Sequence, residues 1–164
     1  MNDKLRVGFK ITVFNSEKTM NYFVYFIVAV LASCCGFLVH LINAEWVNLW
    51  VSGQMQNAVL TPSWDVKYVA LLTSIEYGLA AVFMYSLMRK QLITRGKLFA
   101  VSVFSILLAA IHGAFLRQGL MDWVIGNPFH VVVVQGVMRW LVWVLTAAVV
   151  VIGVEFVFNL KREA

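Results

Sequence analysis

Six polar side chains lie inside or at the edges of long apolar stretches of this sequence, and their types suit ligand binding or proton transfer. They are His40, Glu76, His112, Arg117, Gln135 and Arg139. An arginine guanidinium stays charged and donates two parallel hydrogen bonds to a phosphate or a carboxylate. Histidine, and glutamate in apolar surroundings, exchange protons near neutral pH. The elements that carry these residues decide which of these chemistries is open to them.

The composition is that of a membrane protein. Of 164 residues, 62% are hydrophobic and 13% are Asp, Glu, Lys or Arg, whereas a soluble domain has about 25% charged residues. The mean hydropathy is +0.83. The net charge of +5 comes from short basic clusters beside apolar runs, which is typical of membrane topology and not of a nucleic-acid surface.

The apolar runs predict an all-α fold, a bundle of four transmembrane helices in one domain spanning 20–158. About 20 apolar residues cross a bilayer, and the predicted spans are 20–44, 68–88, 98–116 and 131–158. We expect tails at 1–19 and 159–164 and an interfacial segment between the first two spans, where Pro62 ends any preceding helix. Gly78 in the second span allows close helix approach.

The basic residues predict the orientation. If both termini lie on one side of the membrane, that side carries ten of the thirteen Lys and Arg residues. The positive-inside rule then places both termini in the cytoplasm. All six tryptophans fall in or near the opposite half, as expected of an interfacial belt. The short loops and this charge bias favour a bacterial inner membrane.

Helical rise places two of the polar residues near the middle of the hydrocarbon layer. Glu76 is 13 residues from Arg89, roughly 20 Å, and His112 is 15 residues from Lys97, roughly 22 Å. An ionised side chain at that depth costs at least ~2.5–3.5 kcal/mol. Glu76 must therefore be protonated, paired or open to water, with His112 and Arg139 as its candidate partners.

Two interpretations of these residues involve ion pairs or anions. In one, an ion pair of Glu76 simply fixes the helices of the bundle. In the other, Arg117, Arg139 and His112 form an outward-facing pocket for an anionic headgroup, with Gln135 and His40 nearby and Glu76 or His112 as a possible general base. Glu155, near the cytoplasmic boundary, is expected to pair with a basic residue of the connection between the second and third spans.

Two further interpretations remain open. Glu76 and His112 form a proton or cation relay in one of them. In the other, His40, Glu76, His112 and His130 hold a metal or haem, but no two of them lie three or four residues apart on one helix, so the spacing gives this no support. The adjacent Cys34 and Cys35 are interpreted as packing residues. We expect no metal and no cofactor.

No Gly-rich phosphate loop, HExxH, GxSxG or CxxC sequence occurs, so many enzyme classes have no support. We therefore expect a small accessory or interaction protein that packs with or regulates a larger membrane complex. Its expected partners are membrane lipid and other integral membrane proteins or further copies of itself, and no nucleic acid. The alternative is a membrane enzyme or carrier that binds a lipid-like or small anionic substrate through Glu76, His112, Arg117 and Arg139.

Overall fold

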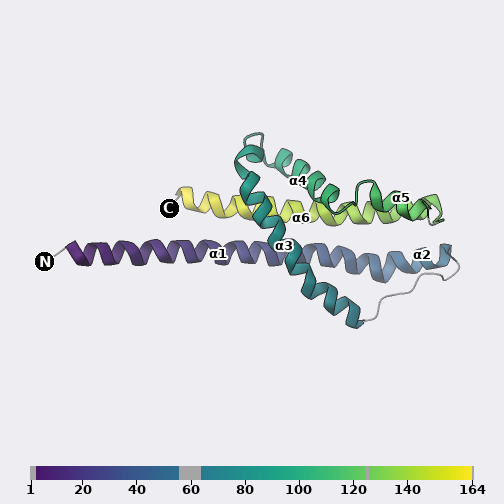
Figure 1. The fold of residues 1–164 in the computed structure, drawn as a ribbon, viewed down its shortest axis with the longest axis horizontal. Coiled ribbons are helices and arrows are strands. Elements are labelled where there is room, and N and C mark those ends of the chain that lie inside the picture. Colours follow the sequence, from purple (N-terminus) through teal and green to yellow (C-terminus); the bar gives the residue numbers. More distant parts are fainter. Residues whose placement is uncertain (1–2, 56–63, 125, 164) are drawn as a thin grey trace.

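The computed structural model describes residues 3–55, 64–124 and 126–163, and all regular structure in these ranges is helical. The helices are α1 (Asp3–Ile42), the π-helical turn η1 (Asn43–Val47), α2 (Asn48–Gln54), α3 (Trp64–Ile93), α4 (Lys97–Ile111), α5 (Arg117–Val124) and α6 (Phe129–Glu163). Figure 1 shows α1, η1 and α2 following one line. The helix-rich architecture that the sequence predicts is confirmed.

Three helical stretches in the described residues are long and apolar enough to cross a membrane. They are Tyr22–Gln54, Lys67–Ile93 and Phe129–Asn159, with 33, 27 and 31 residues. At 1.5 Å per residue each exceeds the roughly 30 Å of a hydrocarbon layer. α4 is also apolar but has only 15 residues, or about 22 Å. The structure thus has three helices of spanning length where the sequence predicts four.

The predicted span 98–116 ends early because Gly113 closes α4. Gly113 has a φ of +68°, a left-handed conformation that glycine adopts without a steric penalty. Its N–H donates to the Ala110 carbonyl at 3.0 Å, and the Ala114 N–H donates to the Ala109 carbonyl at 2.8 Å. This pair of bonds is a Schellman cap. The helix therefore stops at Ile111, and a turn separates it from α5.

The first apolar helix extends beyond both predicted limits. Residues 3–19, expected to be a tail, form the first turns of α1, and the helix continues through η1 and α2 to Gln54. No proline precedes Pro62, so no residue with a fixed backbone interrupts this helix. The expected interfacial segment thus begins later than predicted, and its Pro62 lies outside the described residues.

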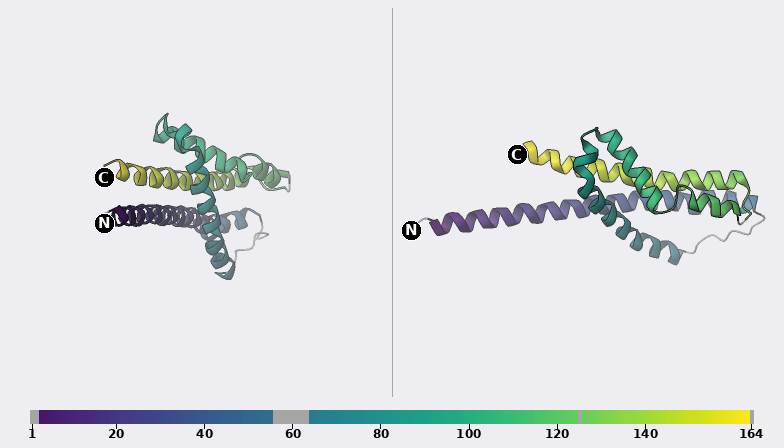
Figure 2. Two further views of the ribbon diagram at one scale, coloured as in Figure 1. Left: turned by 60° about the vertical axis from the view of Figure 1, so that its left-hand side comes forward. Right: turned by 45° about the horizontal axis from the view of Figure 1, so that its top comes forward.

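Two long antiparallel helices, α1 and α6, lie side by side, and α3 crosses them obliquely (Figures 1 and 2). α4 and α5 lie along α6, and α1 begins at the same end of the molecule at which α6 ends. A common core of α1, α3, α4 and α6 includes the fully buried Tyr85 and Phe104, whose ring centroids are 5.5 Å apart.

Glycines mark the points where α1 meets its neighbours. A Cβ on Gly78 of α3 would collide with Ser33 Oγ and the Ala29 carbonyl of α1. A Cβ on Gly153 of α6 would come within 2.9 Å of Val28. Small residues let membrane helices approach this closely. The close approach predicted at Gly78 is confirmed.

Candidate functional site

Trp140 of α6 holds the turn between α4 and α5. Its Nε1 donates a 2.8 Å hydrogen bond to the Ala114 carbonyl. Its ring also stacks on Phe115, with centroids 5.7 Å apart. The Trp140 side chain thus holds the turn against α6 through two separate contacts. His112 is the first residue of this turn and Arg117 follows it, so both are positioned by the same anchor.

His112 is held in one orientation and one tautomer. Its Nδ1 lies 2.9 Å from the Leu108 carbonyl oxygen, so the neutral ring carries its proton on Nδ1 and leaves Nε2 as an acceptor. The ring stacks on Trp143 at 3.8 Å between centroids and meets the Tyr77 ring at 5.4 Å. His112 therefore presents a fixed hydrogen-bond acceptor between α3, α4 and α6.

Arg139 of α6 is paired with a carboxylate of α5. Its Nη1 lies 2.5 Å from Asp122 Oδ2, and its Nη2 donates a long hydrogen bond of 3.5 Å to Gln135 Oε1. The side chains of Arg139 and Asp122 are 28% and 16% exposed. Since the two charges cancel, Arg139 gives the site a pre-formed donor group but no net charge.

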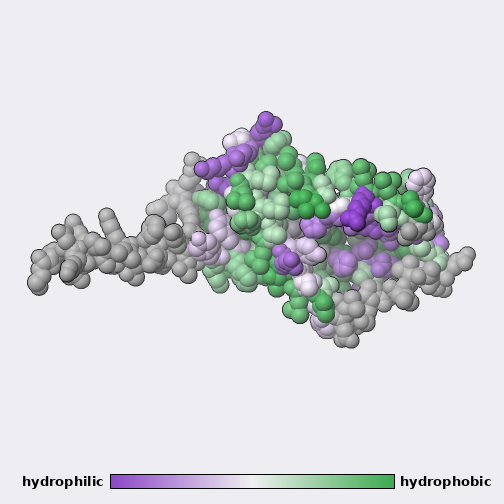
Figure 3. All heavy atoms as spheres, in the orientation of Figure 1, coloured by the Kyte–Doolittle hydropathy of each residue, from purple (hydrophilic) through white to green (hydrophobic). Residues whose placement is uncertain are grey.

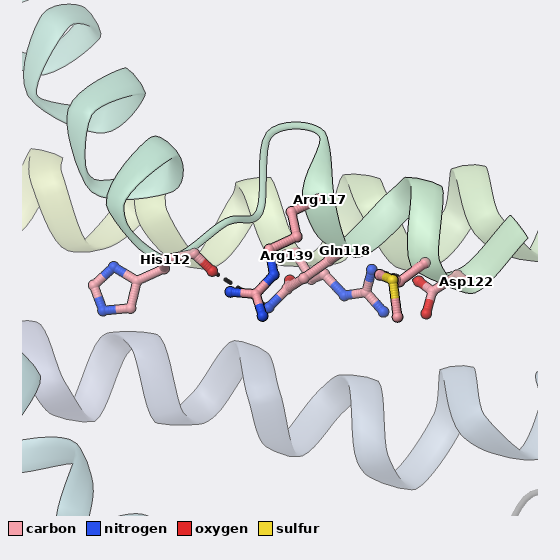
Figure 4. A pocket seen from close by; sticks show the side chains of 6 residues that line it. His112, Arg117, Gln118, Asp122 and Arg139 are labelled. Atoms are coloured by element: carbon pink, nitrogen blue, oxygen red, sulfur yellow. Dashed lines mark hydrogen bonds and ion pairs between the residues drawn. The ribbon is translucent and has the colours of Figure 1, made fainter. Parts of the chain in front are cut away.

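Arg117 supplies the net positive charge of the site. Its side chain is exposed and makes no ion pair within the described ranges. It lines a pocket of about 400 Å³ together with His112, Gln118, Met121, Asp122 and Arg139. Figure 4 shows these side chains in a row between α5 and α6 on one side and α1 on the other. The pocket thus carries a net charge of +1.

A second, mostly apolar cavity of about 610 Å³ adjoins this pocket. Its walls come from α1, α3 and α6, and it shares His112, Gln118 and Arg139 with the polar pocket. Small and aromatic residues such as Gly36 and Trp143 line the rest. Figure 3 shows hydrophilic residues gathered among hydrophobic ones near the α5 end. The two spaces together combine a polar end with an apolar body.

The structure brings most of the predicted site residues together. His112, Arg117 and Arg139 line the polar pocket. Gln135 contacts Arg139, and His40 lines the apolar cavity. Two arginines and a histidine thus lie in one pocket, beside the apolar cavity.

Glu76 lies apart from this group. Its side chain is exposed, lines neither cavity and forms no ion pair with a described residue. The expected pairing of Glu76 with His112 or Arg139 is therefore wrong. The physical reason is that α3 packs on α1 through Gly78, which lies about 160° around the helix axis from Glu76. The proton relay has no contact to support it.

The four residues considered for a metal or haem do not converge. His130 lies at the α2 end of the molecule, where its Nε2 is 3.3 Å from Gln54 Oε1 and its ring meets the Trp50 ring at 5.8 Å. Within the described ranges no three His, Cys, Asp or Glu side chains are grouped as metal ligands would be. No residue of the site is therefore assigned to a metal.

Sequence reasoning missed Gln118 and Asp122, because they lie between the predicted spans 98–116 and 131–158. The structure has a helix, α5, over Arg117–Val124. The available signal was the four-residue spacing of Gln118 and Asp122, which places both on one face of a helix. Gln118 Nε2 also donates a 3.4 Å hydrogen bond to the His112 carbonyl.

A second polar cluster joins α3 and α6 toward the end where α6 finishes. Arg89 donates two hydrogen bonds of 2.7 Å to the two carboxylate oxygens of Glu155. The Tyr85 hydroxyl donates to the same carboxylate at 3.0 Å, and the Arg89 guanidinium lies 3.6 Å from the Phe158 ring centroid. The predicted pairing of Glu155 with a basic residue of the short connection is confirmed. Every group here is paired, so the cluster is structural.

Comparison of this chain with protein-family models, with curated proteins and with solved structures finds no match in any of the three.

Proposed function

We propose that this chain is an integral membrane protein that binds a singly charged anionic amphiphile. The charged headgroup lies in the polar pocket, and the apolar part of the ligand fills the cavity between α1, α3 and α6. The observation that carries this proposal is the unpaired Arg117 beside the neutral Arg139–Asp122 pair, where the polar pocket meets the apolar cavity.

The charges of the pocket favour one class of headgroup. A net charge of +1 matches a phosphodiester or a carboxylate better than a doubly charged phosphate monoester. Arg117 donates to the anion, and Arg139 has further N–H groups beyond its ion pair. The Nε2 atom of His112 accepts a hydrogen bond from a ligand hydroxyl. A glycerol-type headgroup on a phosphodiester satisfies all three groups.

We infer the membrane arrangement from the same geometry. α1, α3 and α6 span the bilayer, and α4 with its following turn forms the fourth crossing of a four-helix bundle. α1 begins and α6 ends at one end of the molecule. Most of the basic residues lie in these two helix ends and in the connection between α3 and α4 around Arg95. By the positive-inside rule both termini are cytoplasmic, in a bacterial inner membrane, and the pocket opens toward the outer side.

Lipid binding by the purified protein tests the proposal. The protein in a neutral detergent is titrated with phosphatidylglycerol, phosphatidylcholine or glycerol phosphate, and bound species are counted by native mass spectrometry. We expect phosphatidylglycerol to bind, phosphatidylcholine to bind at least tenfold more weakly, and glycerol phosphate not to bind, because it cannot fill the apolar cavity. Binding of glycerol phosphate alone would identify a small anion as the ligand.

A matched pair of variants locates the binding. Arg117→Gln removes the unpaired cation and is expected to weaken phosphatidylglycerol binding by about ten- to a hundredfold, the range for a hydrogen bond to a charged group. Arg95→Gln removes an exposed arginine from the α3–α4 turn and is the control. Equal binding by the two variants would contradict the proposal.

A second candidate function is that of an accessory subunit in a larger membrane complex. The observation that favours it is Glu76, a carboxylate turned away from the rest of the bundle. Gentle purification from the native membrane with mass spectrometry of co-purifying proteins tests it. A stoichiometric membrane-protein partner supports this function, and its absence under conditions that keep lipid bound contradicts it.

A further inference from the structure

We propose that the outward face of α3 docks against a membrane helix of a different protein, and that this helix places a lysine or arginine opposite Glu76. The inference deepens the accessory-subunit function and rests on it. It uses no residue of the lipid-binding cavity.

The face is defined by the residues that share its side of α3. Leu72, Phe83 and Leu87 are 70%, 65% and 67% exposed, and Glu76 is exposed among them. The Glu76 carboxylate accepts no hydrogen bond from the described part of the chain and lines neither cavity.

In the membrane arrangement proposed above, Glu76 lies at a depth where water does not solvate it. Two residues further along α3, Gly78 packs on Ala29 and Ser33. These lie in the middle of the run 20–44, which holds no Asp, Glu, Lys or Arg. Ionisable side chains at such depth almost always pair with another group or face a protein interior. An outward carboxylate thus points to a protein that covers it.

The charges of the chain exclude a second copy as that protein. In the three apolar stretches of spanning length, Glu45 pairs with Lys67 and Glu155 pairs with Arg89. Arg139 pairs with Asp122 of α5.

Lys90 is the remaining Lys or Arg residue of these stretches, and it lies 14 residues from Glu76 along α3, about 21 Å away. In a second copy, these stretches therefore hold no unpaired Lys or Arg at the depth of Glu76, and the unpaired Arg117 of α5 lies in the polar pocket instead. We therefore assign the cation to a different protein.

Site-specific photocrosslinking in the native membrane tests this inference. Phe83, two turns from Glu76 on the same face, is replaced by p-benzoylphenylalanine. Phe156 of α6 is the matched control, because it is a phenylalanine of equal exposure, 63% against 65%, on another helix. We expect position 83 to give one adduct with another integral membrane protein, whose crosslinked segment contains Lys or Arg within an apolar run. Position 156 should give no such adduct.

Charge reversal then identifies the contact. Glu76→Gln in the position-83 protein is expected to reduce the adduct at least fivefold, and Glu76→Lys with the partner's basic residue changed to Glu is expected to restore it. An adduct with a second copy, crosslinks to lipid alone, or an adduct insensitive to Glu76→Gln would overturn the inference. If a partner co-purifies while position 83 yields no protein adduct, the accessory function stands and only this docking face fails.

Discussion

Asp122 on α5 forms an ion pair with Arg139 on α6, with 2.5 Å between Oδ2 and Nη1, where the polar pocket meets the apolar cavity. Both atoms are buried, and neither has a further hydrogen-bond partner in the described part of the chain. The pair joins two helices and also sets the net charge of the pocket. Its removal should therefore change ligand preference as well as stability.

Asp122→Asn should shift the preference of the pocket toward doubly charged headgroups. The substitution raises the net charge from +1 to +2 and frees the Arg139 guanidinium. We expect the affinity for phosphatidic acid, relative to phosphatidylglycerol, to rise roughly tenfold, equivalent to about 1.4 kcal/mol. Lipid titration followed by native mass spectrometry measures this ratio, and an unchanged ratio would show that Asp122 does not set the charge that the ligand meets.

Glu155→Gln should destabilise the protein, because it leaves Arg89 without its carboxylate. Removing one partner of a buried ion pair costs about 3–5 kcal/mol. The Glu155 side chain is 4% exposed and that of Arg89 is 22% exposed, so we expect the lower end of this range. Thermal unfolding in detergent measures the loss.

The matched control for this experiment is Glu76→Gln. It changes the same residue type, but at an exposed position that forms no ion pair with any residue the structure describes. We expect no loss of stability from Glu76→Gln in the purified protein. If the two variants unfolded at the same temperature, the Arg89–Glu155 pair would have no structural role.

Gly78→Ala should weaken the packing of α3 on α1. The added Cβ collides with a backbone carbonyl of α1, which cannot rotate away as a side chain does, so the helices must separate. Overpacking of this kind costs typically ~1–3 kcal/mol. Gly136→Ala in α6 is the control, because a Cβ there meets no atom within 4 Å. Unfolding in detergent compares the two, and a loss that is equal in both would argue against this crossing.

Gly113→Ala should impair lipid binding by disturbing the turn that positions His112 and Arg117. A left-handed conformation costs a residue with a Cβ roughly 1–2 kcal/mol, and Gly113 has a φ of +68°. We expect weaker phosphatidylglycerol binding with the helix content retained. Gly119→Ala in α5, where φ is not in the left-handed region, is the control. Circular dichroism verifies the fold, and titration measures the affinity.

Much of the architecture follows from the sequence. The apolar runs locate both ends of α3 and α6 to within five residues, because length and the absence of charge are what a bilayer requires. The pairing of Glu155 was predictable because the basic residues of the nearby connection are almost the only groups with which its carboxylate can pair. His112, Arg117 and Arg139, which the sequence predicts to form one pocket, do line a common pocket.

Only the tertiary structure decided which side of each helix packs on its neighbours and which side points outward. A membrane helix is apolar toward lipid and toward its neighbours, so hydrophobic periodicity does not separate the buried face from the outer one. Gly78 packs on α1 and thereby turns Glu76 outward, although depth alone placed Glu76 with His112. Gly113 lies inside the predicted span 98–116, but it ends α4 with a left-handed cap. Both outcomes depend on close backbone contacts, which composition and spacing do not encode.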